Sequence, residues 1–356
     1  MGGKSALFIV FIRRKNMELF DMLKALCEAN GTSGDETAAA KVAAEYLGKF
    51  MPVDIDVLGN VTGDTGVKGS KILLDAHLDR IGFAVTAIDE KGFLKVARVG
   101  GIDPIVLAAA EVTVHGKRDV YGVVTSTPPH LSKSSESKAR EIADIAVDIG
   151  MSKEEAEKII SIGDRITMNG DIKKMLGERV CGAALDDRSG VAAILRCLEI
   201  LGGKVKELPI AVMFSSCEET GSAAAKSGSF NTAPDEAIAV DVSFAKAPGI
   251  KESVRAELGK GTMIGYAPSL NFELSRRLED LAKEKSIAYQ TEVMGSSTGT
   301  NADDMVTAGK GTKMALLSIP QRNMHTQAEI VDLRDIESTA QLMAAYILER
   351  EGRENA

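Results

Sequence analysis

Short apolar runs alternate with amphipathic helical segments in the second half of the chain, and this alternation restricts the fold more than any other feature. After residue 170, the spacing of apolar residues predicts helices at 189–201, 271–286 and 333–349. Apolar runs predict buried strands at 209–216, 236–244 and 313–319. Strands separated by helices favour a parallel-type sheet covered on both faces. We therefore expect an α/β fold with a mixed sheet sandwiched by helices.

The region between residues 82 and 170 has a different pattern. Short β-rich runs with turn residues between them predict strands at 83–88, 93–99, 111–115 and 120–125. Two helical segments follow, at 135–149 and 152–162, and Ser152 with Glu155 forms a capping box at the start of the second. We interpret 82–170 as an inserted, small β-barrel-like domain, and 17–81 with 171–356 as the catalytic α/β domain.

Composition excludes several classes of protein. The 356 residues include 43 Lys and Arg against 51 Asp and Glu, a net charge of −8, which argues against a nucleic-acid binder. No apolar stretch approaches the ~20 residues of a membrane span. The four cysteines lack close spacing and indicate reduced thiols in a cytoplasmic protein. Residues 1–16 carry basic residues after an apolar run, unlike a signal peptide, and we interpret them as a dispensable extension.

Side chains that bind divalent metal ions recur at or near the carboxyl ends of the predicted strands. They are His77 and Asp79, Asp186 and Asp187, Glu218 and Glu219, Asp241, and His325. Ligands of open α/β sheets bind at this edge. Asp241 lies inside an apolar strand, where an unpaired carboxylate would cost several kcal/mol. The pattern predicts two metal ions that share a carboxylate and a water, with one glutamate of the Glu218–Glu219 pair as the base.

The order and spacing of the motifs resemble those of the tetrahedral (TET) aminopeptidases, co-catalytic metallopeptidases that include glutamyl and deblocking aminopeptidases. The resemblance rests on AHLDRIG at 76–82, PPHL at 128–131, ALDDR at 184–188, CEETG at 217–221, AVDV at 239–242 and MHT at 324–326. It implies that one metal ion is held by His77, Asp186 and Asp241, and the other by Asp186, Glu219 and His325. It also implies a cis peptide between Asp186 and Asp187.

The same resemblance implies a mechanism and an assembly. Glu218 would be the general base for a dimetal-bound hydroxide, and Asp79 would orient His77. The two divalent ions would be Zn²⁺, with Co²⁺ or Mn²⁺ as alternatives. The substrates would be peptides with a free N-terminus. The inserted domain would form dimers, and the dimers would assemble into a dodecamer.

Other functions stay open at this point. A metal-dependent deacylase or dipeptidase would use the same metal motifs. An endoglucanase-like glycosidase is disfavoured, because hydrolysis by two carboxylates leaves His77 and His325 unexplained. A non-catalytic assembly protein is disfavoured by the presence of Glu218. We expect structural roles for His115 and His130, and a solvated face for the acidic pair Glu279–Asp280.

Overall fold

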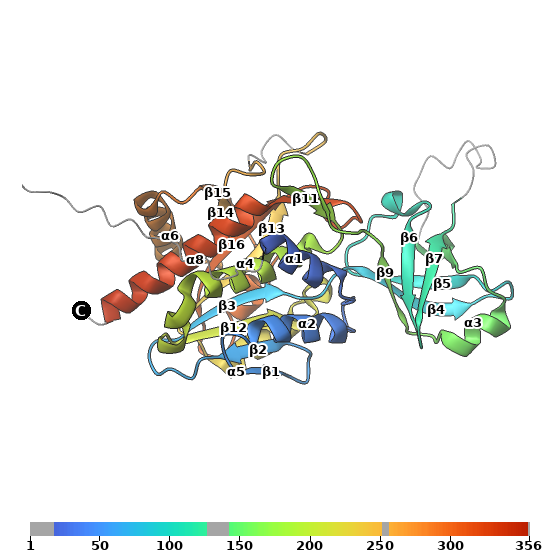
Figure 1. Ribbon diagram of the computed structural model, residues 1–356, viewed down its shortest axis with the longest axis horizontal. Helices are drawn as coiled ribbons and strands as arrows, with labels where there is room; N and C mark the ends of the chain where they lie inside the picture. Colours follow the sequence, from blue (N-terminus) through green and yellow to red (C-terminus); the bar gives the residue numbers. More distant parts are fainter. Residues whose placement is uncertain (1–17, 127–141, 251–255, 355–356) are drawn as a thin grey trace, which may run out of the picture.

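An eight-stranded mixed sheet between two layers of helices forms the main body of the computed structural model, which describes residues 18–126, 142–250 and 256–354 (Figure 1). The strand order is β1-β2-β12-β3-β13-β16-β14-β15. The strands span Val53–Ile55 (β1), Val61–Asp64 (β2), Ile72–His77 (β3), Ile210–Ser215 (β12), Glu236–Phe244 (β13), Thr262–Tyr266 (β14), Tyr289–Val293 (β15) and Lys313–Gln321 (β16). The central strands β12, β3, β13 and β16 run parallel, so their carboxyl ends meet at one edge. The predicted fold class is confirmed.

Helices cover both faces of this sheet, which explains the nearly continuous apolar runs in its central strands. One layer contains α1 (Leu19–Glu28), α2 (Thr37–Leu47), α4 (Leu185–Leu201), α6 (Phe272–Lys285) and α8 (Leu333–Glu354). The other contains α5 (Ala223–Thr232) and α7 (Ala302–Met305). Successive strand residues point to opposite faces, so Ile72 and Leu74 enter the first core and Leu73 enters the second. None of the described helices is long and apolar enough to cross a lipid bilayer.

The core around Leu74 supports a prediction about stability. Leu74 lies in the middle of β3 and is fully buried. We expect Leu74→Ala to lower the free energy of unfolding by about 2–5 kcal/mol, because it removes buried methyl groups and leaves a cavity. Urea unfolding measures this change. Leu58→Ala is the control, since Leu58 is 45% exposed, and its effect should stay within about 0.5 kcal/mol. Equal losses in the two variants would contradict this description of the core.

A closed six-stranded barrel is inserted between β3 and the second half of the sheet, and in Figure 1 it lies to the right of the main body. Its order is β4-β5-β8-β7-β6-β9. The strands span Gly82–Ile88 (β4), Leu94–Val99 (β5), Glu111–His115 (β6), Asp119–Val124 (β7), Ala146–Asp148 (β8) and Arg165–Met168 (β9). The short helix α3 (Lys153–Ile159) begins with the predicted capping box, in which both Ser152 and Glu155 make their expected hydrogen bonds.

One predicted helix of this region is wrong. Residues 142–149 contain a 3-10 turn at Ile142–Asp144 and the strand β8, where the sequence pattern predicted the end of a helix at 135–149. β8 pairs with both β5 and β7, so closing the barrel overrides the local helical spacing. The remainder of that segment, the motif at 128–131 with His130, and the extension at 1–16 lie outside the described residues.

A third, small sheet has three strands. It contains β10 (Lys173–Lys174), β11 (Arg179–Gly182) and β17 (Glu329–Asp332). β11 leads directly into the start of α4, and β17 follows the loop after β16. Gly182 pairs with Glu329 in the antiparallel register of β11 and β17. This pairing brings the residues around 186 and 325 together, although they are far apart in the sequence.

Candidate metal centre

The predicted ligands come from five segments that meet at the carboxyl edge of the sheet. His77 is the last residue of β3, and Asp241 lies in the second half of β13. Glu219 lies in the 3-10 turn Glu218–Thr220 that follows β12. Asp186 lies in the first turn of α4, and His325 lies in the loop after β16. The structure therefore brings together the side chains for which the sequence predicted a shared role.

His77, Asp186 and Asp241 form the first of two groups with the geometry of a metal site. Their ligand atoms lie within 4.8 Å of one another, and all three residues are buried. His77 Nε2 is 2.9 Å from Asp186 Oδ1 and 3.8 Å from Asp241 Oδ1. A nitrogen and two carboxylate oxygens converging on one point match the ligands that zinc-like ions take.

Asp186, Glu219 and His325 form the second group, whose ligand atoms also lie within 4.8 Å of one another. His325 Nε2 is 3.3 Å from Asp186 Oδ2 and 3.3 Å from Glu219 Oε1. Asp186 thus presents Oδ1 to the first group and Oδ2 to the second. This is the arrangement of a carboxylate that bridges two ions.

The backbone around Asp186 is adapted to this position. The Asp186–Asp187 peptide is cis, as the resemblance implied. Both residues have non-helical dihedral angles within the first turn of α4. Asp187 is buried but belongs to neither group, and its Oδ1 accepts a hydrogen bond from the Gly190 amide at 2.9 Å. Asp187 therefore stabilises the start of α4, while Asp186 faces the two histidines.

Asp79 contacts both His77 and the glutamate pair. His77 Nδ1 lies 3.1 Å from the Asp79 carbonyl oxygen and 3.4 Å from its Oδ1. The Asp79 carboxylate also accepts hydrogen bonds from the backbone amides of Glu218, at 2.9 Å, and Glu219, at 3.2 Å. The hydroxyl of Ser33 donates a further hydrogen bond to it. Asp79 can therefore fix the tautomer of His77 and also the position of the glutamate-bearing turn.

The inserted barrel reaches the second group through the segment after β5. His325 Nδ1 donates to the carbonyl oxygen of Gly101 at 2.7 Å, which leaves Nε2 free to face Asp186 and Glu219. A side chain at Gly101 would meet the His325 ring at 3.1 Å, and one at Gly100 would meet Glu219. The approach of the barrel to the site therefore requires small residues here.

Negative charge dominates the cluster. Burial raises the pKa of Glu218 to about 7, and the charges of Glu219 and Asp79 add to this effect. Burial also raises the pKa of Asp241 well above its usual range. Burial alone would lower the pKa of His77, but its hydrogen bonds to Asp186 and Asp79 raise it well above its usual range. Divalent cations would supply the positive charge that this set of buried carboxylates lacks, so the residues fit a metal centre.

Sequence reasoning missed three residues that support the site: Ser33, Gly101 and Glu329. Each acts through a contact with a distant segment, and none lies in a motif of metal-binding residue types. His115, for which the sequence predicted a structural role, makes hydrogen bonds to Asp119 and Thr167 on the barrel. Glu279, which was predicted to lie on a solvated face, makes hydrogen bonds to Tyr266 and Lys283. Neither residue belongs to a metal group.

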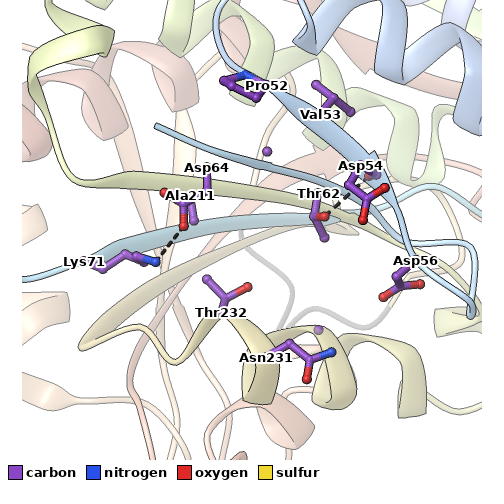
Figure 2. Close-up of a pocket in the computed structure, with 12 residues that line it drawn as sticks. Pro52, Val53, Asp54, Asp56, Thr62, Asp64, Lys71, Ala211, Asn231 and Thr232 are labelled. Atoms are coloured by element: carbon purple, nitrogen blue, oxygen red, sulfur yellow. Dashed lines mark hydrogen bonds and ion pairs between the residues drawn. The ribbon is translucent and has the colours of Figure 1, made fainter. Parts of the chain in front are cut away.

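A separate groove lies beside the edge strand β1, and Figure 2 shows the side chains that line it. Its volume is about 420 Å³, and its polar lining includes Asp54, Asp56 and Asp64, with Lys71 paired to Asp64 at 2.6 Å. Ala211 places it near the start of β12, whereas the metal groups lie beyond the other end of that strand. No residue of either metal group lines this groove.

Histidines and carboxylates gathered at the carboxyl edge of a mixed α/β sheet are the arrangement expected of a metal-dependent α/β enzyme. Comparison with known families identifies the family within this class. Residues 59–342 match the family described as M42 glutamyl aminopeptidase, and the chain belongs to this family. It is therefore a peptidase, a hydrolase that acts on peptide bonds, and the predicted relation to the TET aminopeptidases is confirmed.

Individual relatives agree with this assignment. The chain is 35% identical to the lysyl aminopeptidase of Pyrococcus furiosus, over 93% of this chain and 97% of that protein. The structure of aminopeptidase APDkam598 from Desulfurococcus kamchatkensis superimposes with a TM-score of 0.86 at 31% identity, covering 93% of this chain and 95% of the other. The Pyrococcus horikoshii TET1 peptidase, which can assemble into a tetrahedron or a large octahedral shell, gives a TM-score of 0.80 at 28% identity, covering 93% and 99%.

Proposed function

We propose that this protein removes N-terminal residues from peptides with two divalent metal ions in each chain. The observation that carries the proposal is the position of Asp186, which presents one carboxylate oxygen to His77 and Asp241 and the other to Glu219 and His325. A bridging carboxylate between two mixed nitrogen and oxygen groups is what a co-catalytic pair requires. The aminopeptidase activity of the M42 relatives supports the reaction class.

The residues fit Zn²⁺, with Co²⁺ or Mn²⁺ as alternatives, because imidazole and carboxylate ligands suit all three. One ion would be held by His77, Asp186 and Asp241, and the other by Asp186, Glu219 and His325. When bound, the pair would polarise the substrate carbonyl and lower the pKa of an attacking water.

Glu218 is the general base of the proposed mechanism. Its carboxylate takes a proton from water as the water oxygen bonds to the first peptide carbonyl carbon. It then returns the proton to the nitrogen of the leaving amine as the carbon–nitrogen bond breaks. Asp79 holds the backbone of Glu218 in place during both steps.

The substrate class follows from the relatives rather than from the metal groups. Lysyl aminopeptidase and APDkam598 are aminopeptidases by name, and on this basis we propose peptides with a free N-terminus as substrates. Hydrolysis of a panel of aminoacyl p-nitroanilides tests this, with N-acetylated peptides as the matched control. Cleavage of the free-amine panel alone is the expected result. Cleavage of the acetylated peptides alone would favour a deacylase.

We propose that residues 82–170 form a dimerisation domain and that the dimers assemble into a dodecamer in the cytoplasm. Three large apolar side chains of this domain, Ile105, Tyr121 and Ile162, are exposed in the single chain and would be available for association. The tetrahedral assembly of the TET1 peptidase supports closed particles. The four free cysteines are compatible with a reducing compartment. Light scattering should give the mass of twelve chains, and a monomer at micromolar concentration would contradict the assembly.

A further inference from the structure

Glu329 is a buried carboxylate that belongs to neither metal group, yet both its oxygens contact residues that do. Its Oε1 accepts a hydrogen bond from the backbone amide of His325 at 3.0 Å. Its Oε2 accepts one from the backbone amide of Asp186 at 3.2 Å. One side chain therefore connects the residue that bridges the two groups with the histidine of the second group.

The two backbone amides that donate hydrogen bonds to Glu329 belong to irregular backbone. His325 has a left-handed conformation, with φ at 61°, and Asp186 has ψ at 111° inside the first turn of α4. Regular helix or strand bonding does not hold these peptide groups, so their positions depend on other partners. The pairing of β11 with β17 places Glu329 between them, since Glu329 lies opposite Gly182, four residues before Asp186.

Burying a carboxylate is costly unless hydrogen bonds compensate it. Glu329 is 2% exposed, and its two amide partners both carry metal-binding side chains. Asp79 shows the same arrangement, because its carboxylate accepts hydrogen bonds from the backbone amides of Glu218 and Glu219. Two buried carboxylates thus each fix a pair of site residues through the backbone, and neither lies among the ligand groups.

We propose that Glu329 is a positioning residue that sets the separation between Asp186 and His325. It thereby sets the affinity of the second group for its metal ion. The inference rests on the proposed two-ion function. The second group contains both residues whose amides bond Glu329, whereas the first group contains only Asp186. Loss of the Glu329 carboxylate should therefore weaken metal binding by the second group more than by the first.

The test is an isothermal calorimetric titration of the metal-free full-length protein with Zn²⁺ alone. Glu329→Gln keeps the size of the side chain but replaces one accepting oxygen with an NH₂ group, which cannot accept an amide hydrogen bond. We expect the Zn²⁺ dissociation constant of the second group, identified as the binding step that is lost in Glu219→Ala, to rise by about 10–100-fold, the range found for partners that orient metal ligands. The constant of the first group should change less. If Glu329→Gln does not fold, Glu329→Asp takes its place: it keeps the carboxylate but has a shorter reach, and we expect it to raise the same dissociation constant by a smaller factor.

Asp335→Asn is the matched control. Asp335 is also a fully buried carboxylate in the C-terminal part of the chain, and it also accepts two backbone amides, from Gly259 at 2.6 Å and Gly261 at 2.7 Å. It contacts neither metal group. We expect Asp335→Asn to lower the melting temperature of the metal-free protein while both Zn²⁺ affinities stay at the wild-type values.

The outcomes separate the inference from the proposed function. Wild-type protein that binds two Zn²⁺ ions, with a Glu329→Gln variant that binds them equally well, would overturn the positioning role alone. An equal loss of affinity in Asp335→Asn would also overturn it, because the effect would then be a general consequence of lost stability. Wild-type protein that binds no Zn²⁺ would overturn both the proposed function and the inference.

Discussion

Glu218→Gln should lower kcat by about 10²–10⁴-fold, the usual contribution of a positioned proton-transfer group. The amide keeps the shape of the side chain and the backbone contact to Asp79, but it cannot take a proton from water. Because Glu218 belongs to neither metal group, we expect two bound metal ions and a KM close to that of the wild type. Steady-state kinetics on an aminoacyl p-nitroanilide, with elemental analysis of the same sample, measure both properties.

Glu279→Gln is the control for this substitution. Glu279 also has an acidic neighbour in the sequence, but it lies on α6, where it bonds Tyr266 and Lys283. Its replacement should leave kcat unchanged. A Glu218→Gln enzyme that retains more than about a tenth of wild-type kcat would contradict the role of Glu218 as general base.

Asp186→Ala should have the second large effect, because this residue is shared by both groups. In the proposed two-ion arrangement its removal would take one ligand from each ion, so we expect the purified variant to contain neither. Metal ions contribute several kcal/mol to the stabilisation of the transition state, so kcat/KM should fall by about 10³-fold or more. Elemental analysis and kinetics on the same preparation measure the two losses together.

Single-group variants provide the comparison. Asp241→Ala removes a residue of the first group alone, and Glu219→Ala removes one of the second group alone. Each should retain one ion per chain. An Asp186→Ala protein that still holds two ions, or a Glu219→Ala protein that loses both, would contradict the bridging arrangement.

The central strands could be predicted from the sequence because burial on both faces makes them continuous apolar runs. The strand β13 was predicted with the bounds it has, Glu236–Phe244, and β12 to within one residue. The outer strands β14 and β15 were not predicted. β15 contains Gln290, Thr291 and Glu292 and lies at the edge of the sheet, so its sequence lacks the apolar signal. The strand β8 was missed because it depends on pairing with β5 and β7.

The candidate site divides in the same way. Histidines and carboxylates directly after apolar strands could be predicted from the sequence, because a buried charge is costly unless it is paired or bound to a metal ion. The residues that position these side chains could not be predicted. Glu329 depends on the register of β11 with β17, and Gly101 depends on how the barrel lies against the loop of His325. Asp79 was predicted as a partner of His77, but its hydrogen bonds to the amides of Glu218 and Glu219 follow from the course of the turn after β12.

The most direct test of the two-ion account is a Zn²⁺ titration of the metal-free protein in which binding and peptide hydrolysis are measured on the same samples. We predict that the metal-free protein is inactive, that binding saturates at two ions per chain, and that full activity appears only as the second ion binds. Hydrolysis by the metal-free protein, or full activity after one equivalent with no further binding, would contradict it.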